Sequence, residues 1–215
     1  MHAAEAFGDD PGAVLFPGEE ALIARASPRR RGEFATAREC ARAALVRLGV
    51  SPAPVLADEL GAPRWPEGIA GSITHCAGYR AAAVAHTADV MSLGLDAAPN
   101  RPLRKPDMLT VIARDCERAR LPALRAAAPG VCWDQMLLSA KESVYKAWYP
   151  IARRWLDFAS ADITFDVRGR EFLARLLVRV PPALAAVGDP GTLRGTWVAS
   201  PDILLTAVVN IANER

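Results

Sequence analysis

The chain has 215 residues, of which 51% are hydrophobic and 23% are charged. This composition supports a packed core and excludes an intrinsically disordered protein, and the length allows one large domain or two domains of about 100 residues. The formal net charge of +2 is too small to indicate a nucleic-acid partner, and we expect none. Any site for a polyanion must therefore be local.

The cysteines and the N-terminal residues predict the compartment. The four cysteines show no C-x-x-C spacing and no repeating framework, so we expect reduced thiols. The start, "MHAAEAFGDDPG", is acidic and rich in turn residues, unlike a signal peptide. No run of about 18 uncharged apolar residues predicts a membrane span. We therefore expect a cytoplasmic protein that does not associate with membranes.

The first part of the chain predicts two helices, a loop and three strands. A short helix is expected at 19–26, ending at a Ser-Pro pair. A longer helix is expected from Glu33 to Leu48, because apolar residues recur there at three- and four-residue steps and a glycine follows. Four prolines in 51–68 predict an extended loop. The three strands are expected at 71–76, 81–86 and 91–96.

The second part begins with a proline-containing segment, 100–106, that predicts a hinge. A helical pattern follows at 108–120, and 121–130 is expected to be irregular. Asp134 predicts the N-cap of a second long helix that ends at Pro150. Strands are expected at 161–167, 171–180, 195–200 and 203–212, with turns at 181–191.

Each part thus gives a helix together with several strands. This order favours an α+β fold made of two similar halves. We place the N-terminal half at 1–102 and the C-terminal half at 103–215.

The second long helix carries three polar side chains on one face. Ser139, Glu142 and Lys146 are separated by three and four residues, whereas Lys141 lies about 100° around the helix from Glu142. One interpretation is an ordinary solvated Glu–Lys pair. The other is a catalytic or binding face.

A single carboxylate ends the apolar run "SLGLDAAPN". Asp96 could cap the turn that leads into the proline. It could also hold magnesium against phosphate oxygens, together with a carboxylate from a helix. The sequence leaves both interpretations open.

Hydrogen-bonding side chains cluster in "GSITHCAGYR". Ser72, Thr74 and His75 could surround a phosphate or a base, although a lone histidine beside a strand is more often structural. The basic run 29–31 is either a solvated patch or a phosphate contact. The sequence contains no Walker A loop, no G-x-G-x-x-G, no H-E-x-x-H and no G-x-S-x-G.

Three segments in this order, "GSITHC", "SLGLDAAP" and "SAKESVYKAWYP", resemble the 4′-phosphopantetheinyl transferases. The similarity spans 29–206, and it is to the pseudo-dimeric branch that serves polyketide, siderophore and nonribosomal peptide synthases. This resemblance implies an intramolecular pseudo-dimer of two α+β halves with the active site in the cleft between them. The N-terminal half would contact coenzyme A, and the C-terminal half would carry the KE-motif helix and the carrier-docking region.

The resemblance also implies a reaction and its partners. A Mg²⁺-dependent enzyme, with Mn²⁺ as an alternative metal, would move 4′-phosphopantetheine from coenzyme A to a serine of an apo acyl or peptidyl carrier protein and release 3′,5′-ADP. Such chemistry needs a cation on the diphosphate, positive groups on its oxygens and a base for the serine. A monomer is expected, because one chain supplies both sides of the cleft.

Site residues follow from the matching motif positions. Asp96 and Glu142 would hold the metal, and Glu142 would be the general base, directly or through water. Catalytic roles are also implied for Lys146 and His75. The residues implied to contact coenzyme A are Arg30, Arg38, Ser72, Thr74, His75, Lys141, Lys146, Trp155 and Leu156.

Two departures from the family pattern motivate an alternative. Ala98 stands where a second strand carboxylate is usual, and Ala57 and Leu60 stand where close relatives have lysines. The alternative is a catalytically impaired or inactive homologue that binds carrier protein or coenzyme A without efficient transfer.

Overall fold

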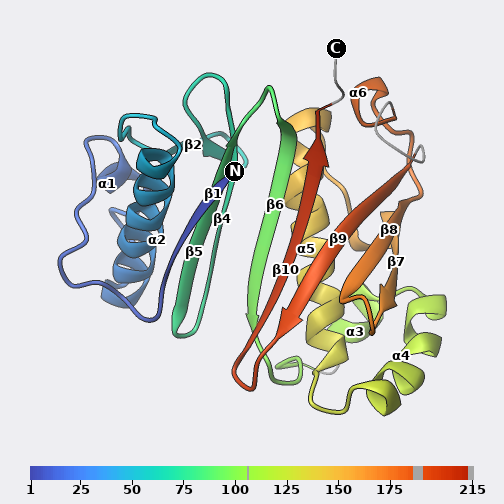
Figure 1. The fold of residues 1–215 in the computed structure, drawn as a ribbon. Coiled ribbons are helices and arrows are strands. Elements are labelled where there is room, and N and C mark those ends of the chain that lie inside the picture. Colours follow the sequence, from blue (N-terminus) through green and yellow to red (C-terminus); the bar gives the residue numbers. More distant parts are fainter. Residues whose placement is uncertain (106, 186–190, 213–215) are drawn as a thin grey trace.

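The computed structural model describes residues 1–105, 107–185 and 191–212. Besides one small two-stranded sheet, it has two larger sheets that meet in the middle of the molecule, each packed against one long helix (Figure 1). The α+β prediction with two similar halves is confirmed.

In the first half, α2 packs on a three-stranded antiparallel sheet with the order β1-β5-β4. Small buried side chains, among them Ala37, Ala41 and Ala44, face this sheet and let the helix approach it closely. The elements are β1 (His2–Ala6), α1 (Glu19–Leu22), α2 (Pro28–Arg47), β2 (Leu56–Ala57), β3 (Pro63–Arg64), β4 (Ile69–Cys76) and β5 (Tyr79–His86).

Helix α2 begins earlier than its apolar pattern predicts. The Ser27 hydroxyl accepts a hydrogen bond from Arg30 N, and Pro28 occupies the first helical turn. These are strong helix-start signals, so 28–32 is helical and the predicted start at Glu33 is wrong. The helix predicted at 19–26 is shortened to α1, and the proline-rich loop contains the small β2–β3 hairpin.

In the second half, α5 packs on a five-stranded antiparallel sheet with the order β6-β10-β9-β8-β7. Its predicted apolar stripe is confirmed, because Leu137, Ala140, Val144 and Ala147 are buried. The elements are β6 (Val90–Pro99), α3 (Met108–Ile112), α4 (Asp115–Ala127), α5 (Trp133–Ala152), η1 (Phe158–Ser160), β7 (Ala161–Asp166), β8 (Glu171–Leu176), α6 (Pro182–Ala185), β9 (Thr192–Ala199) and β10 (Ile203–Ile211).

Two helix predictions in this half are corrected. The pattern at 108–120 is broken between α3 and α4, and α4 then continues through Pro122 to Ala127. Burial of Leu121 in the core offsets the hydrogen bond that the proline cannot make. The segment 121–130 is therefore mostly helical rather than irregular.

The ends of α5 also differ from the prediction. Cys132 is the N-cap, and Asp134 lies in the first turn, where its carboxylate accepts a hydrogen bond from Leu103 N at 3.2 Å. Pro150 falls inside the last turn instead of ending the helix. The carboxylate near the helix N-terminus remains electrostatically favourable.

Strand β6 connects the halves. It precedes the proline-containing segment in sequence, but it pairs with β10 at the edge of the second sheet. At Gly94 it lies so close to α5 that an added Cβ would be 1.9 Å from Ser143 O. Only glycine permits this approach, which fixes the short distance between β6 and the helix.

The segment expected to act as a hinge is fixed to the second half. The Asn100 side chain donates to Gly130 O at 2.9 Å and to Ser200 O at 2.8 Å, and it accepts from Cys132 N at 2.9 Å. Leu103 is buried. The last residue of the predicted segment, Pro106, lies outside the described residues.

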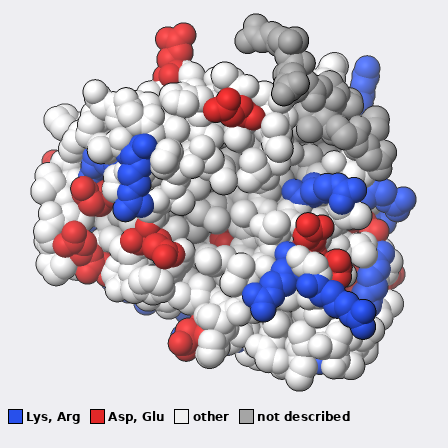
Figure 2. Space-filling view, in the orientation of Figure 1, with Lys and Arg blue, Asp and Glu red and all other residues white. Residues whose placement is uncertain are grey.

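The face of the second sheet that α5 does not cover is exposed and basic. Residues of β8 alternate between exposed and buried, so this strand has one solvated face. Blue side chains gather over this half in Figure 2. The exposed arginines on β8, β9 and the turn before β8 are Arg168, Arg170, Arg175 and Arg194.

Candidate active site

Asp96 of β6 faces α5, and its two carboxylate oxygens have different partners. Lys146 Nζ donates to Oδ1 at 2.7 Å, and Ser139 Oγ donates to Oδ2 at 2.8 Å. Thr74 Oγ1 lies 3.5 Å from Oδ1. The alternative in which Asp96 only caps a turn is not supported, because its partners come from β4 and α5.

Glu142 lies on the same face of α5, one turn from both Ser139 and Lys146. Burial and the negative charge of Asp96 raise the pKa of Glu142, while Lys146 opposes this increase. Among the residues that the structure describes, none donates a hydrogen bond to this carboxylate. Two neighbouring carboxylates, one of them without a donor, favour a bound cation.

The donor set fits a hard divalent metal. Mg²⁺ is usually held by one or two carboxylates, with waters and substrate phosphates completing the octahedron, and Mn²⁺ accepts similar ligands. Asp96 and Glu142 supply this number. Within the described residues, no group of three or more His, Cys, Asp or Glu side chains is placed to hold a metal.

A basic group lies on the first half. Arg30 NH1 is 2.6 Å from His75 Nε2, and because a guanidinium only donates, Nε2 is the acceptor. Burial and the positive charge of Arg30 lower the pKa of His75 to about 4, although Glu33 opposes this decrease. The imidazole is therefore neutral near pH 7.

Arg38 lies further along α2 and is largely buried. Its Nε donates to Val55 O at 3.1 Å, and its guanidinium lies 3.9 Å from the centre of the Phe34 ring. Burial lowers the pKa of Arg38 to about 10; Glu19 opposes this, and Arg30 adds to the decrease. An incoming anion would relieve the repulsion between Arg30 and Arg38.

The structure gives Ser72 and Thr74 a different task from the predicted contact with coenzyme A. Both hydroxyls are buried and point to β6, where Ser72 Oγ accepts from Leu95 N at 2.9 Å and Thr74 Oγ1 accepts from Ala97 N at 2.8 Å. These bonds join the two sheets. Both hydroxyls therefore have a structural role, and Thr74 also contacts Asp96.

Lys141 is not brought to the cluster. Its ammonium is buried, lies 2.8 Å from Glu117 Oε2, and donates to Phe158 O at 2.6 Å and Ala161 O at 3.0 Å. Burial lowers the pKa of Lys141, and Glu117 opposes this decrease. Because all three ammonium protons have acceptors, the predicted phosphate contact of Lys141 is not supported.

The residues predicted to line the pantetheine arm are separated. Trp155 is 69% exposed, and its ring centre lies 4.8 Å from that of Tyr145. Leu156 is buried in the core of the second half, so it cannot line an open surface. Tyr145 was not among the predicted site residues, although its position three residues after Glu142 places it on the same face of α5.

Comparisons with known proteins identify the family. Residues 18–85 match the 4′-phosphopantetheinyl transferase N-terminal domain, and residues 92–188 match the 4′-phosphopantetheinyl transferase superfamily. The 4′-phosphopantetheinyl transferase Svp of Streptomyces mobaraensis is 49% identical, with 96% of this chain and 83% of that protein covered. The chain belongs to the 4′-phosphopantetheinyl transferase family.

Other relatives support this assignment. The 4′-phosphopantetheinyl transferase PptT of Mycobacterium tuberculosis is 44% identical, with 96% of this chain and 90% of that protein covered. Enterobactin synthase component D of Salmonella typhi is 32% identical, with 85% and 73% covered. The protein is thus an enzyme that transfers the 4′-phosphopantetheinyl group.

The structure shows how exposed the positions are at which this transferase departs from the family pattern. Ala98 is 4% exposed and packs in the core of the second half. Leu60 is exposed. Burial raises the pKa of the neighbouring Asp58, but hydrogen bonds from Tyr149 OH at 2.9 Å and from the backbone N–H groups of Ala62 and Leu60 outweigh it, so this pKa is lowered. The β2–β3 hairpin is therefore attached to α5 through an acidic residue.

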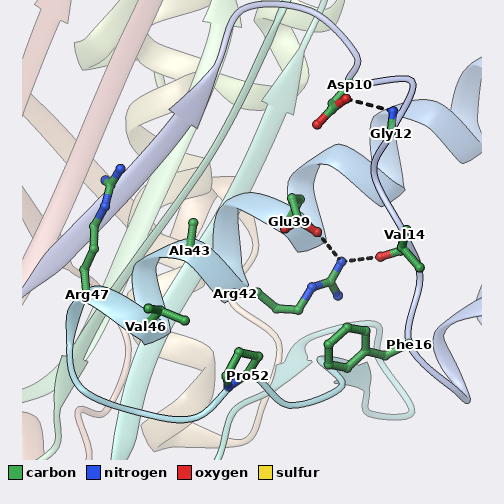
Figure 3. A pocket seen from close by; sticks show the side chains of 10 residues that line it. All are labelled: Asp10, Gly12, Val14, Phe16, Glu39, Arg42, Ala43, Val46, Arg47 and Pro52. Carbon is green, nitrogen blue, oxygen red and sulfur yellow. Dashed lines mark hydrogen bonds and ion pairs between the residues drawn. The ribbon is translucent and has the colours of Figure 1, made fainter.

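A cavity of about 550 Å³ lies elsewhere, on the outer side of α2 (Figure 3). Arg42 points into it and pairs with Glu39 at 2.9 Å and with the buried Glu19 at 3.0 Å. Arg42 also donates to Val14 O. These contacts hold the N-terminal segment on α2, and none of the predicted site residues lines the cavity.

Among the described helices, none combines the length and hydrophobicity that crossing a membrane requires.

Proposed function

We propose that this transferase moves 4′-phosphopantetheine from coenzyme A to a serine hydroxyl of an apo acyl or peptidyl carrier protein, in a Mg²⁺-dependent reaction that releases 3′,5′-ADP. The observation that carries the proposal is the pairing of Asp96 and Glu142 beside Lys146. Carboxylates of this kind hold a cation against a diphosphate, and the ammonium can bind one of its oxygens.

The metal would supply charge neutralisation at the diphosphate. Asp96 and Glu142 would hold it, and Mn²⁺ is a second candidate. Glu142 would also accept the serine proton, directly or through water, the role of a positioned carboxylate in general base catalysis. The serine oxygen then bonds to the phosphorus that carries pantetheine, and the bond from that phosphorus to 3′,5′-ADP breaks.

Coenzyme A would lie across the two halves. Arg30, Arg38 and the neutral His75 would bind its phosphates, and Lys146 would contact the diphosphate near the metal. Trp155, whose ring contacts that of Tyr145, would lie along the pantetheine arm. Because Ser72, Thr74, Lys141 and Leu156 are engaged elsewhere, we do not include them in this contact set.

The acceptors would be carrier proteins of multienzyme synthases that make peptides, polyketides or siderophores. The name of one relative, Enterobactin synthase component D, supports the siderophore class. A monomer working in the cytoplasm is part of the same proposal, since one chain supplies both sheets that flank the site.

The test is direct. The protein is incubated with an apo carrier protein, coenzyme A and Mg²⁺, and the carrier is weighed by mass spectrometry. The proposal expects a gain of one phosphopantetheine group that is lost when the metal is chelated. An unchanged mass across several acyl and peptidyl carriers would contradict it.

A further inference from the structure

Ser139 is a fully buried hydroxyl in the middle of α5. It is 0% exposed, and its Oγ donates to Asp96 Oδ2 at 2.8 Å. A buried hydroxyl is costly unless it is hydrogen-bonded, and serine is a weaker helix former than alanine. The neighbouring buried positions Ala140 and Ala147 show that small apolar residues suit this helix. The hydrogen bond to the Asp96 carboxylate therefore explains why a serine, and not an alanine, occupies this buried position.

A second buried hydroxyl supports the first. Thr206 of β10 is 1% exposed and lies opposite Asp96 in the β6–β10 ladder. Its Oγ1 donates to Ser139 O at 2.9 Å and lies 3.0 Å from Ser139 Oγ. Each hydroxyl has one proton. Since a charged oxygen is the stronger acceptor, the Ser139 proton goes to Asp96, and the Thr206 bond fixes this turn of α5 against the sheet.

The arrangement orients the whole carboxylate. Ser139 holds Oδ2, while Lys146 holds Oδ1 at 2.7 Å. Ser139 also precedes Glu142 by one turn on the same face of α5. One turn of helix therefore presents Glu142 and sets the direction in which Asp96 points. This coupling fixes the two proposed metal ligands relative to each other.

We propose that Ser139, supported by Thr206, is a positioning residue that sets the affinity of the Asp96–Glu142 site for its divalent metal. The proposal rests on the metal-dependent function proposed above. Groups that hydrogen-bond to metal ligands typically change metal affinity or activity about 10-fold to 100-fold when they are removed. Ser139 and Thr206 are not expected to touch either substrate.

The experiment compares two buried serines of the same helix. Ser143 is also 0% exposed, but its hydroxyl donates only to Ala140 O within the helix. Mn²⁺ binding is measured from the EPR signal of the free ion with coenzyme A present, and the Mg²⁺ dependence of carrier modification is measured in parallel. Ser139→Ala should weaken Mn²⁺ binding about 10-fold or more, whereas Ser143→Ala should change it less than about 2-fold.

A second variant keeps the proposal testable if Ser139→Ala does not fold. Thr206→Val removes the supporting hydroxyl at nearly constant volume and should weaken Mn²⁺ binding about 2-fold to 5-fold, less than the direct loss. Because Thr206 donates to the backbone Ser139 O, which Ser139→Ala retains, the double variant should bind Mn²⁺ no more tightly than Ser139→Ala alone. A folded Ser139→Ala protein with wild-type affinity, or a larger loss for Thr206→Val than for Ser139→Ala, would overturn the positioning role.

Asp96→Asn separates this proposal from the proposed function. If Asp96→Asn abolishes Mn²⁺ binding while Ser139→Ala leaves it unchanged, the metal site stands and only the positioning role is wrong. If the wild-type protein binds no Mn²⁺ beyond a coenzyme A blank, both proposals are wrong.

Discussion

Glu142 combines a raised pKa with a carboxylate that no described group stabilises by a hydrogen bond. The burial and repulsion that raise its pKa also destabilise its charged form in the folded protein. We expect Glu142→Gln to lower the transfer rate by a factor of about 10² to 10⁴, the usual contribution of a general base. The melting temperature should stay equal or rise, because the repulsion with Asp96 disappears.

Rates come from the mass gain of the carrier, and thermal melts report stability. Glu171→Gln, an exposed glutamate at the start of β8, serves as the control. A Glu142→Gln enzyme with wild-type turnover would show that this residue is neither base nor metal ligand.

His75 makes stability depend on pH in a defined window. The pKa of His75 is lowered from 6.5 to about 4 in the folded protein, so between these values the unfolded chain binds more protons. The contribution of this group to stability is therefore highest above pH 6.5 and is lost as pH falls toward 4.

We expect the melting temperature of the wild-type protein to fall more than that of His75→Gln between pH 7 and pH 4.5. His86→Gln, at the exposed end of β5, controls for the loss of an imidazole elsewhere. If the melting temperatures of the wild-type protein and His75→Gln fell equally across this pH range, His75 would not be held neutral.

At the scale of elements, Lys141 and Glu117 tie α5 to α4 and β7. The carboxylate accepts from Lys141, from Arg114 N at 2.8 Å and from Ile163 N at 2.7 Å. Removing one partner of a buried ion pair typically costs about 3–5 kcal/mol, because the other charge is left uncompensated. Lys141→Met should therefore lower the free energy of unfolding by this amount.

Adding Glu117→Gln to Lys141→Met should restore most of the loss. The amide can still accept from one backbone N–H and can donate to a carbonyl that Lys141 served. In this double variant the KM for coenzyme A should stay within about 2-fold of wild type, because Lys141 binds Glu117, Phe158 O and Ala161 O and not the substrate. If the double variant were stable but its KM for coenzyme A rose about 10-fold, the scale of one lost charged contact, Lys141 would be shown to contact the coenzyme A phosphates.

The elements show what the sequence can and cannot predict. Apolar periodicity located α2, α5 and the strands from β4 onward, because burial selects one face of each element, but it did not find β1, β2 or β3. It missed 28–32, where a cap decides helicity, and 121–127, where Pro122 argues against a helix but tertiary packing overrides it. The motifs also led to Asp96, Glu142 and Lys146, which the structure brings close together. Lys141 shows the limit of such predictions, because residue spacing determines which face of a helix a side chain occupies but not which group it contacts there.

At the scale of the whole molecule, two sheets are joined without a continuous backbone ladder. Ser72 and Thr74 take the place of carbonyl acceptors for two N–H groups of β6. Apolar side chains pack on either side of these bonds, with Ala83 and Leu93 in one cluster and Ala81 and Ala97 in the other. We call the hydrogen bonds from β6 to Ser72 and Thr74 the hydroxyl seam. The position of Asp96 relative to the basic group around Arg30 therefore depends on this seam.

The seam predicts that the two halves unfold together. Replacing Ser72 by Ala and Thr74 by Val leaves two buried N–H groups without acceptors, at a cost of about 1–3 kcal/mol each. We expect the double variant to lose stability on this scale and to lose transfer activity, because Asp96 no longer has a fixed place relative to Arg30 and His75. Ser143→Ala, which removes a buried hydroxyl within one helix, should cost much less.

Urea unfolding followed by far-UV circular dichroism and by tryptophan fluorescence measures both effects. Trp65 reports on the first half, and the other four tryptophans lie in the second. Wild-type transitions should coincide for the two probes, as expected of one cooperative unit. If the wild-type halves unfolded separately, nothing would join them into one cooperative unit. If the double variant kept full stability, the apolar clusters and not the two hydroxyls would join the halves.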